Sequence, residues 1–453
     1  MKRTAVLVLM ALALSALVAA PPQQVTKTLS VQGLIYDLKH PDADRREESA
    51  KILGDKEVRA AVPALIEAAD DPEAKVRAAV LYALDRIRDM RALPVFIKLT
   101  ADRDEGIRKT AINAIVRLYV LDEGGFVAGS KKVLSFFNPF DSNYNDLIVE
   151  PYVPVSPDAV QALAARLSDP SNGVRKGAVM SLGILRGRGA LSAMAEKLPA
   201  EPKNDIRIEY FRSFYKIGDP SACGALIPFV NDPEKDVHDE AILVAGLLRC
   251  PEAVEPLMDI FESGIKERDK ILKVVPASRP EDLQIKCLQA LALIGDPRAE
   301  KLFVAALNHK ITGMQMAGAE GLARIANPAH RDTLEAARER SEERRNQLSL
   351  DFALYRVGRP GALEEMVSEL GSVRYSDQVF DYLAGFSPEE CPRLFPLLRS
   401  SKGKVRVKLI DALGLAGGRD TLAELESYTH DSNTDVANAA INAIRRLRAK
   451  LGE

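Results

Sequence analysis

The segment Asp71–Leu84, with the sequence DPEAKVRAAVLYAL, holds the pattern that decides the fold. An apolar residue stands directly before Arg77, and apolar residues return three, four, six, seven and ten positions after it: Val80, Leu81, Ala83, Leu84 and Ile87. This spacing places the apolar side chains along one face of a helix, whereas a strand would show a two-residue alternation. The segment therefore predicts an amphipathic helix that follows a turn at Asp71.

The same pattern recurs along the chain at intervals close to 31 residues. The residues equivalent to Arg77 are Arg46, Arg108, Arg175, Arg207, His238, Gln284, Gln315, Gln347, Arg406 and Ala437, with a blurred copy near Asp377. Each period also contains a first helix, and an Asp-Pro or Asp-Ser turn often separates it from the second. Two short helices have too little interior to stand alone, so we expect the pairs to stack into one continuous core. The sequence thus predicts an all-α protein, an α-α superhelix of about twelve helix–turn–helix repeats.

These repeats resemble HEAT repeats, in particular the short bacterial kind that recurs in phycobilin-lyase-type proteins. The residues that carry the resemblance are a turn Asp, an apolar-Arg pair six residues later, and Leu-Gly and Ile-Gly-Asp runs: Asp71 with Arg77, Asp102 with Arg108, Asp169 with Arg175, Ser181–Gly183, Ile217–Pro220 and Ile294–Pro297. The resemblance implies a HEAT-repeat solenoid in which these Asp and Arg side chains bond along the stack as a structural ladder. Five repeats lack the Arg, so we expect the ladder to be broken in the middle: His238, Gln284, Gln315, Gln347 and Ala437.

The first twenty residues differ in kind from the rest. Lys2 and Arg3 precede an apolar run from Ala5 to Ala20, which is the order of a secretory signal peptide. The alternative is an uncleaved membrane anchor, but the run is shorter than the roughly 20 residues that a spanning helix needs. We therefore expect residues 1–20 to be a signal peptide that is removed, residues 21–30 to be a linker, and the mature chain to have no membrane span. This predicts an exported protein, periplasmic or extracellular.

Two segments interrupt the repeats. The first, 122–156, divides repeats 1–3 (31–121) from repeats 4–12 (157–450) and predicts an irregular loop rich in aromatic residues. Because aromatic side chains on such loops often anchor protein interfaces, its candidate partner contacts are Phe126, Phe136, Phe137, Phe140, Tyr144 and Tyr152. Equally, these side chains fit a structural cover that packs on the repeats. The second segment, near 264–281, predicts a basic solvated loop.

The sequence offers no recognisable catalytic, cofactor or metal motif. Its five His residues show no metal-ligand spacing, and His238 is best interpreted as a replacement for the Arg of its repeat. The four Cys residues form no Cys-x-x-Cys pair. Antiparallel helices would bring Cys223 and Cys250 together, so a disulfide is possible in an exported protein, although two buried thiols are favoured.

The formal net charge of −2 and the lack of Trp speak against nucleic-acid binding. A weaker basic signal stands nine residues after the Arg position of several repeats, at Arg86, Arg117, Lys216, Arg324, Arg356 and Arg446. We interpret these cations as complements to helix dipoles.

Together these patterns predict a noncatalytic scaffold of the bacterial cell envelope. It would bind an unidentified protein partner through the concave face of the solenoid and the 122–156 loop. The oligomeric state is left open. The alternative is a lyase-like HEAT-repeat enzyme or a chaperone-like helper that acts on a protein substrate.

Overall fold

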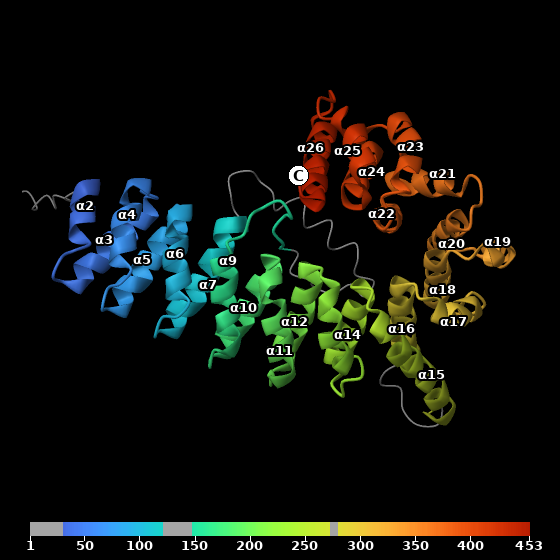
Figure 1. Ribbon diagram of the computed structural model, residues 1–453, viewed down its shortest axis with the longest axis horizontal. Coiled ribbons are helices and arrows are strands. Elements are labelled where there is room, and N and C mark those ends of the chain that lie inside the picture. The colour runs from blue at the N-terminus through green and yellow to red at the C-terminus, as the bar shows by residue number, and fades with distance from the viewer. Residues whose placement is uncertain (1–29, 121–146, 272–279) are drawn as a thin grey trace, which may run out of the picture. The chain divides into compact units, whose positions relative to one another are not determined.

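The computed structural model describes residues 30–120, 147–271 and 280–453 (Figure 1). Within these ranges the chain forms helices, turns and loops and no strand, as predicted. The chain divides into two compact units, Met1–Ile87 and Arg88–Glu453, called unit 1 and unit 2 below. This division falls inside the predicted block of repeats 1–3. The predicted signal peptide, 1–20, lies outside the described residues.

The described part of unit 1 holds two helix pairs, α2 (Val31–Asp37) with α3 (Ala43–Asp55) and α4 (Val62–Ala68) with α5 (Ala74–Ile87). The five apolar positions predicted for the face of α5 are all buried. Helices α3 and α5 pack closely because Gly54 has no side chain. A Cβ atom at that position would lie 2.6 Å from the Cα of Ala83.

The described part of unit 2 holds ten further helix pairs (Figure 1). The first helices of these pairs are α6 (Leu93–Leu99), α9 (Pro157–Ala164), α11 (Leu191–Lys197), α13 (Cys223–Leu226), α15 (Val254–Ile271), α17 (Glu300–Ala306), α19 (Arg331–Arg340), α21 (Ala362–Val367), α23 (Phe395–Ser400) and α25 (Arg419–Glu426). The second helices are α7 (Glu105–Val120), α10 (Asn172–Ile184), α12 (Asn204–Ile217), α14 (Lys235–Leu247), α16 (Pro280–Ile294), α18 (Thr312–Ile325), α20 (Arg344–Arg356), α22 (Ser376–Ala384), α24 (Gly403–Ala416) and α26 (Thr434–Leu451). The described residues of both units therefore contain twelve pairs, the predicted number.

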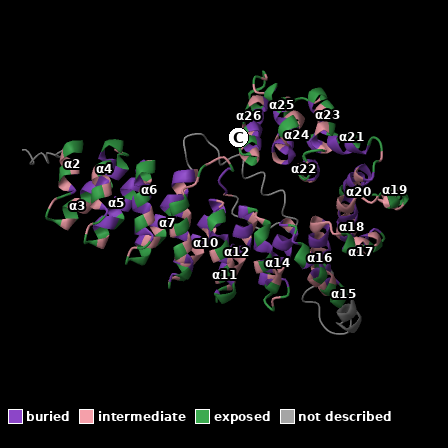
Figure 2. Ribbon diagram, in the orientation of Figure 1, coloured by how far each residue is buried: buried purple, intermediate pink, exposed green. Residues whose placement is uncertain are grey.

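The second helices of unit 2 pack on one another in chain order, from α7 against α10 to α24 against α26. Figure 2 shows buried positions along the faces that neighbouring helices share. Burial of each large aliphatic side chain stabilises the fold by about 1.5–3 kcal/mol. Helix α7 packs directly on α10, and α6 on α9. The repeats on either side of the first inserted segment are thus stacked without interruption.

At several junctions between repeats the chain reverses through a left-handed residue, which a short 3-10 turn follows. After α12 the left-handed residue is Gly218, with φ of 69°, and the carboxylate of Asp219 then accepts a hydrogen bond from the Ser221 N–H at 3.0 Å. After α18 the same place is taken by Ala326, with φ of 54°. The Ile-Gly-Asp run is therefore the end of one repeat and the start of the next.

Part of the second predicted insertion is helical. Helix α15 runs on to Ile271, so the prediction of a loop is wrong for residues 264–271. The reason is local, because residues 265–271 are mostly good helix formers and the next Pro is Pro276. Helix α16 begins at Pro280, where the ring suits a first helical turn.

Candidate functional site

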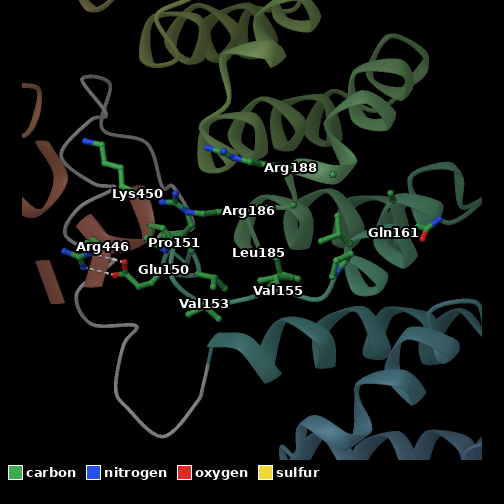
Figure 3. A pocket seen from close by; sticks show the side chains of 18 of the residues that line it. Glu150, Pro151, Val153, Val155, Gln161, Leu185, Arg186, Arg188, Arg446 and Lys450 are labelled. Carbon is green, nitrogen blue, oxygen red and sulfur yellow. Dashed lines mark hydrogen bonds and ion pairs between the residues drawn. The ribbon is translucent and has the colours of Figure 1, made fainter. Parts of the chain in front are cut away.

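A cleft of about 1110 Å³ lies in unit 2, where segment 147–156, helix α9 and the turn after α10 face α24 and α26 (Figure 3). One part of its lining is apolar and includes Ile148, Val149, Val153, Val155, Val160 and Leu185. The charged residues of the lining are Glu150, Arg186, Arg188, Arg446 and Lys450. The cleft therefore combines an apolar wall with an excess of positive charge.

Segment 147–156, the last part of the predicted loop, is held on unit 2 at both of its ends. The backbone N–H of Val149 donates a hydrogen bond to the carbonyl of Ile184, at the end of α10, at 2.8 Å. At the other end, the N–H of Ser156 donates to the hydroxyl of Tyr119 in α7 at 3.1 Å. Ile148 and Val149 are buried. These contacts fix the segment as one wall of the cleft.

Glu150 and Arg446 form a buried ion pair between this segment and the last helix. The Nε and Nη2 atoms of Arg446 donate to the two carboxylate oxygens of Glu150 at 2.9 and 2.7 Å (Figure 3). Burial alone would lower the pKa of Arg446, but the hydrogen bonds to Glu150 raise it. The two residues are 296 positions apart in the chain. A two-bond geometry with both groups buried makes this the most specific contact of the site.

Arg186 and Arg188 supply positive charge that no carboxylate of the described residues neutralises at ion-pair distance. Arg186 follows α10, is partly buried, and reaches toward the Glu150–Arg446 pair (Figure 3). Its Nε has no hydrogen-bond partner among the described residues. Burial lowers the pKa of Arg186, and nearby Glu150 opposes that effect. Arg188 is exposed, so the cleft presents one inner and one outer guanidinium.

Lys450 is fastened at the edge of the cleft. Its Nζ donates to the carbonyls of Leu415, Ala416 and Gly417 at 3.2–3.3 Å. These are free carbonyls at the end of α24, where a cation is favourable. Lys450 therefore has a structural role that Arg186 and Arg188 lack.

Of the six aromatic residues predicted as partner contacts, the structure describes Tyr152. Phe126, Phe136, Phe137, Phe140 and Tyr144 lie outside the described residues. Tyr152 is partly buried beside the cleft, and burial together with Glu150 raises its pKa. Tyr152 therefore stays a candidate for either role, partner contact or structural cover.

The predicted ladder residues bond in two directions. Arg46, Arg108 and Arg175 each donate Nη1 to the carbonyl six residues earlier, at 2.8–3.0 Å. Their remaining nitrogens reach an acid of the following repeat: Arg46 bonds Asp71 at 2.6 Å, Arg108 bonds Asp169 at 2.9 Å and Arg175 bonds Glu201 at 2.8 Å. Within a repeat, Asp71 and Asp102 bond Arg77 and Arg108 through their backbone carbonyls. Glu201 was not predicted as the partner of Arg175 because the ladder acid was expected to be an Asp.

In the middle repeats, several residues that replace arginine still contact the backbone carbonyl six residues earlier. Gln315 and Gln347 donate Nε2 to the carbonyls of His309 and Ser341, again six residues earlier, at 2.7 and 2.6 Å. His238 lies 3.3 Å from the carbonyl of Asp232. Gln284 departs from this pattern and donates to Phe261.

Cys223 and Cys250 are joined by a disulfide, with 5.4 Å between their Cα atoms. The favoured expectation of two buried thiols is therefore wrong. Cys223 begins α13, and Cys250 stands three residues after the end of α14. The antiparallel course of the pair brings these positions together.

Two general features concern the described residues alone. Among them, no group of three or more His, Cys, Asp and Glu side chains is placed to hold a metal ion. No helix in the same ranges is long and apolar enough to cross a membrane.

Three of the residues that define the cleft were not predicted from the sequence: Glu150, Arg186 and Arg188. Arg446 was visible as a member of the basic series but was interpreted as a helix-dipole complement. Its pairing with Glu150 shows a more specific role. The same series supplies Arg324 and Arg356, which line a second pocket.

The comparisons with known proteins give one family match and several distant structural likenesses. The family model of HEAT repeats matches residues 31–116. No curated protein matches the sequence. The chain is similar to importin beta at 13% identity and a TM-score of 0.40, covering 92% of this chain and 57% of that one. It is similar to the Kap95:Nup1 complex at 13% identity and a TM-score of 0.45, covering 98% of this chain and 66% of that one.

A third likeness is to the CpcE and CpcF complex of phycocyanin lyase from Nostoc sp. PCC7120. The identity is 18% and the TM-score 0.25, with 75% of this chain and 99% of that chain covered. This chain spans just over half the length of the importin beta chain. These structural similarities are too distant to indicate an activity or a partner. The HEAT-repeat model thus matches the first part of the chain, residues 31–116, and the described residues as a whole form twelve helix pairs.

Proposed function

We propose that this protein is a noncatalytic scaffold that binds a partner protein in the cleft of unit 2. Helical solenoids present extended surfaces on which other proteins bind. The observation that supports this proposal is the apolar wall beside the two arginines that lack a carboxylate partner, Arg186 and Arg188. The occupant with matching chemistry is an extended segment of a partner protein that carries acidic and aliphatic side chains.

The two halves of the cleft would contribute in different ways. Carboxylates of the bound segment accept charge-assisted hydrogen bonds from the guanidinium groups, which are stronger than neutral ones. Aliphatic side chains that cover Val153, Val155 and Val160 add about 25 cal/mol for each Å² of apolar surface removed from water. Recognition of this kind requires both charge and apolar character in one segment.

The test uses two labelled peptides with alternating residues, Glu with Leu in one and Lys with Leu in the other. Fluorescence anisotropy should show that the Glu peptide binds, that salt weakens it, and that the Lys peptide does not bind. Arg186→Gln with Arg188→Gln should lower the affinity about tenfold or more. Arg419→Gln, an exposed site outside the cleft, should leave it unchanged. Equal binding of both peptides, or binding indifferent to the cleft arginines, would contradict the proposal.

We also propose that residues 123–146 add contacts to the partner through Phe126, Phe136, Phe137, Phe140 and Tyr144. The test replaces 123–146 by a Gly-Ser linker and keeps segment 147–156, because Glu150 is bonded to Arg446. Unchanged helicity with weaker capture of the partner supports these contacts. Unchanged affinity would limit binding to the cleft.

We further propose that the protein is exported and works in the bacterial cell envelope. A signal-like sequence at residues 1–20 supports this, and so does the disulfide, since such bonds persist in oxidising compartments. The intact mass of the native protein should show loss of the first 19–21 residues and of two hydrogens for the disulfide. Full-length, reduced protein in the cytoplasmic fraction would disprove this location.

A further inference from the structure

A second, smaller pocket of about 300 Å³ lies in unit 2, apart from the cleft. Three arginines from three repeats meet there. Arg249 follows α14, Arg324 stands in the last turn of α18, and Arg356 ends α20. Apolar and aromatic side chains complete the lining: Leu247, Leu293, Ile294, Phe352, Tyr382 and Phe386. The rings of Phe352 and Tyr382 are stacked at 4.5 Å between centroids.

Two of the three guanidinium groups have no carboxylate partner at ion-pair distance among the described residues. Arg356 pairs with Glu390 and donates Nε to the carbonyl of Ala323 at 3.1 Å. Arg324 donates Nη1 to the Glu320 carbonyl at 3.2 Å and is partly buried. Arg249 is exposed at the mouth of the pocket. The pocket thus has positive charge available to a ligand.

The acids near these arginines offset part of that charge, because Glu390 pairs with Arg356 and the Glu320 carboxylate interacts electrostatically with Arg324. The Glu320 carboxylate is engaged with the Tyr382 hydroxyl at 2.6 Å. Asp381 lines the pocket, and its Oδ1 has no hydrogen-bond partner among the described residues. Burial, with Asp377 and Glu320 nearby, raises the pKa of Asp381 to about 9. Asp381 is therefore protonated at neutral pH and offers an O–H donor instead of a charge.

We propose that this pocket binds an oxyanion of carboxylate or phosphate size, with Arg249 and Arg324 as charged donors and the carboxyl group of Asp381 beside them. Paired guanidinium groups fit the planar or tetrahedral oxygens of such anions. The rings of Phe352, Tyr382 and Phe386 in the lining would contact an apolar group attached to the anion. The proposal is independent of the cleft, since the two pockets share no lining residue.

The affinity should depend on pH through Asp381. The charged and titratable groups that act on it are Asp377, Glu320, Arg324, Lys408 and Tyr215, and those that line the same pocket are Arg249, Arg356, Tyr382 and Glu390. As the pH rises through about 9, Asp381 ionises, loses its donor and places a negative charge beside the anion. Binding should therefore weaken between about pH 8 and pH 10, and Asp381→Asn, which keeps a neutral donor, should remove most of this decline.

Isothermal titration calorimetry with inorganic phosphate and with benzoate, at constant ionic strength, tests the proposal. We expect one saturable site, weakened about tenfold or more by Arg324→Gln or Arg249→Gln. Arg399→Gln, an exposed arginine outside the pocket, is the charge-matched control. Binding of phosphate alone assigns a phosphate ligand, binding of benzoate alone assigns a carboxylate, and binding of both assigns a site that accepts either oxyanion.

Two results would overturn the site. One is the absence of saturable binding of either probe. The other is undiminished binding in both arginine variants. Should Arg324→Gln lose helicity, Arg249→Gln decides, because its side chain is exposed and its replacement leaves the core intact. The peptide experiment on the cleft reports on different residues, so failure of one proposal leaves the other standing.

Discussion

Asp239 and Asp381 have pKa values that their surroundings move in opposite directions. Burial alone would raise the pKa of Asp239, but His238, Lys235 and Lys286 at 3.2, 2.6 and 2.5 Å lower it strongly. Asp239 thus contributes stability above its ordinary pKa near 4, and this is lost as the pH falls. Asp381 has a raised pKa. Its contribution is present below about pH 4 and is lost as the pH rises toward about 9.

The first prediction follows from the raised pKa of Asp381. Asp381→Asn should raise the free energy of unfolding at about pH 8 by on the order of 1–3 kcal/mol, a value discounted for partial exposure. It should also flatten the decline in stability between about pH 6 and pH 9. Urea unfolding at several pH values measures both effects. Glu335→Gln, at an exposed site with no such environment, is the control. Parallel pH profiles for wild type and Asp381→Asn would refute the assignment.

Ala326 adopts a left-handed conformation that suits glycine. Its φ is 54°, where an L side chain is strained, and Gly218 and Gly295 take the same place in other repeats. We predict that Ala326→Gly raises the free energy of unfolding by about 0.5–1 kcal/mol. Ala336→Gly, at an exposed position inside α19, should lower it by a similar amount. Thermal unfolding distinguishes the two, and destabilisation by both substitutions would contradict the prediction.

At the scale of the helix, Arg46, Arg108 and Arg175 each join a second helix to its own turn and to the next repeat. The carboxylates of Asp169 and Glu201 are nearly fully buried against Arg108 and Arg175. Each arginine therefore serves a structural need rather than a binding surface. This agrees with the backbone bond retained by Gln315 and Gln347, which lack the charge.

We predict that Arg108→Ala and Arg175→Ala each lower the free energy of unfolding by about 1–3 kcal/mol, because a buried carboxylate loses its donors. Arg86→Ala breaks a pair with Glu57 in which both side chains are exposed, and it should cost less than about 1 kcal/mol. Urea unfolding gives the values. An unchanged midpoint in both ladder variants, with the peptide affinity lost, would show that these arginines bind a partner.

The helices were predictable because their signal is local. The spacing around Arg77 returns in every repeat, so twelve pairs follow from the sequence alone. The helix over residues 264–271 was not predicted because charged residues are typical both of loops and of the exposed faces of helices. The left-handed residues Arg186, Arg249 and Ala326 were missed because stacking, not residue type, imposes their conformation. The disulfide depended on a distance between two helix ends that sequence gives only roughly.

At the scale of the molecule, the cleft could not be predicted. Glu150 belongs to a segment that interrupts the repeats, and Arg446 lies 296 residues later. No local sequence pattern links positions so far apart. They meet because α26, the last helix of unit 2, is bonded to segment 147–156 through Arg446 and Glu150. In a simple solenoid each repeat contacts its neighbours alone. The Glu150–Arg446 pair adds a long-range contact to that scheme within unit 2.

The last prediction concerns this long-range contact. Glu150→Gln and Arg446→Gln should each destabilise unit 2 by about 3–5 kcal/mol, because the remaining partner is a buried charge without its counterpart. The double variant should be less destabilised than the sum of the two, since no charge is then left unpaired. Hydrogen exchange followed by mass spectrometry locates the effect. Exchange should rise in segment 147–156 and in α26 and stay unchanged in α2–α5 of unit 1. If the single variants unfold no more readily than Arg419→Gln, or if their effects simply add, the pair does not fasten the last helix and the cleft needs another explanation.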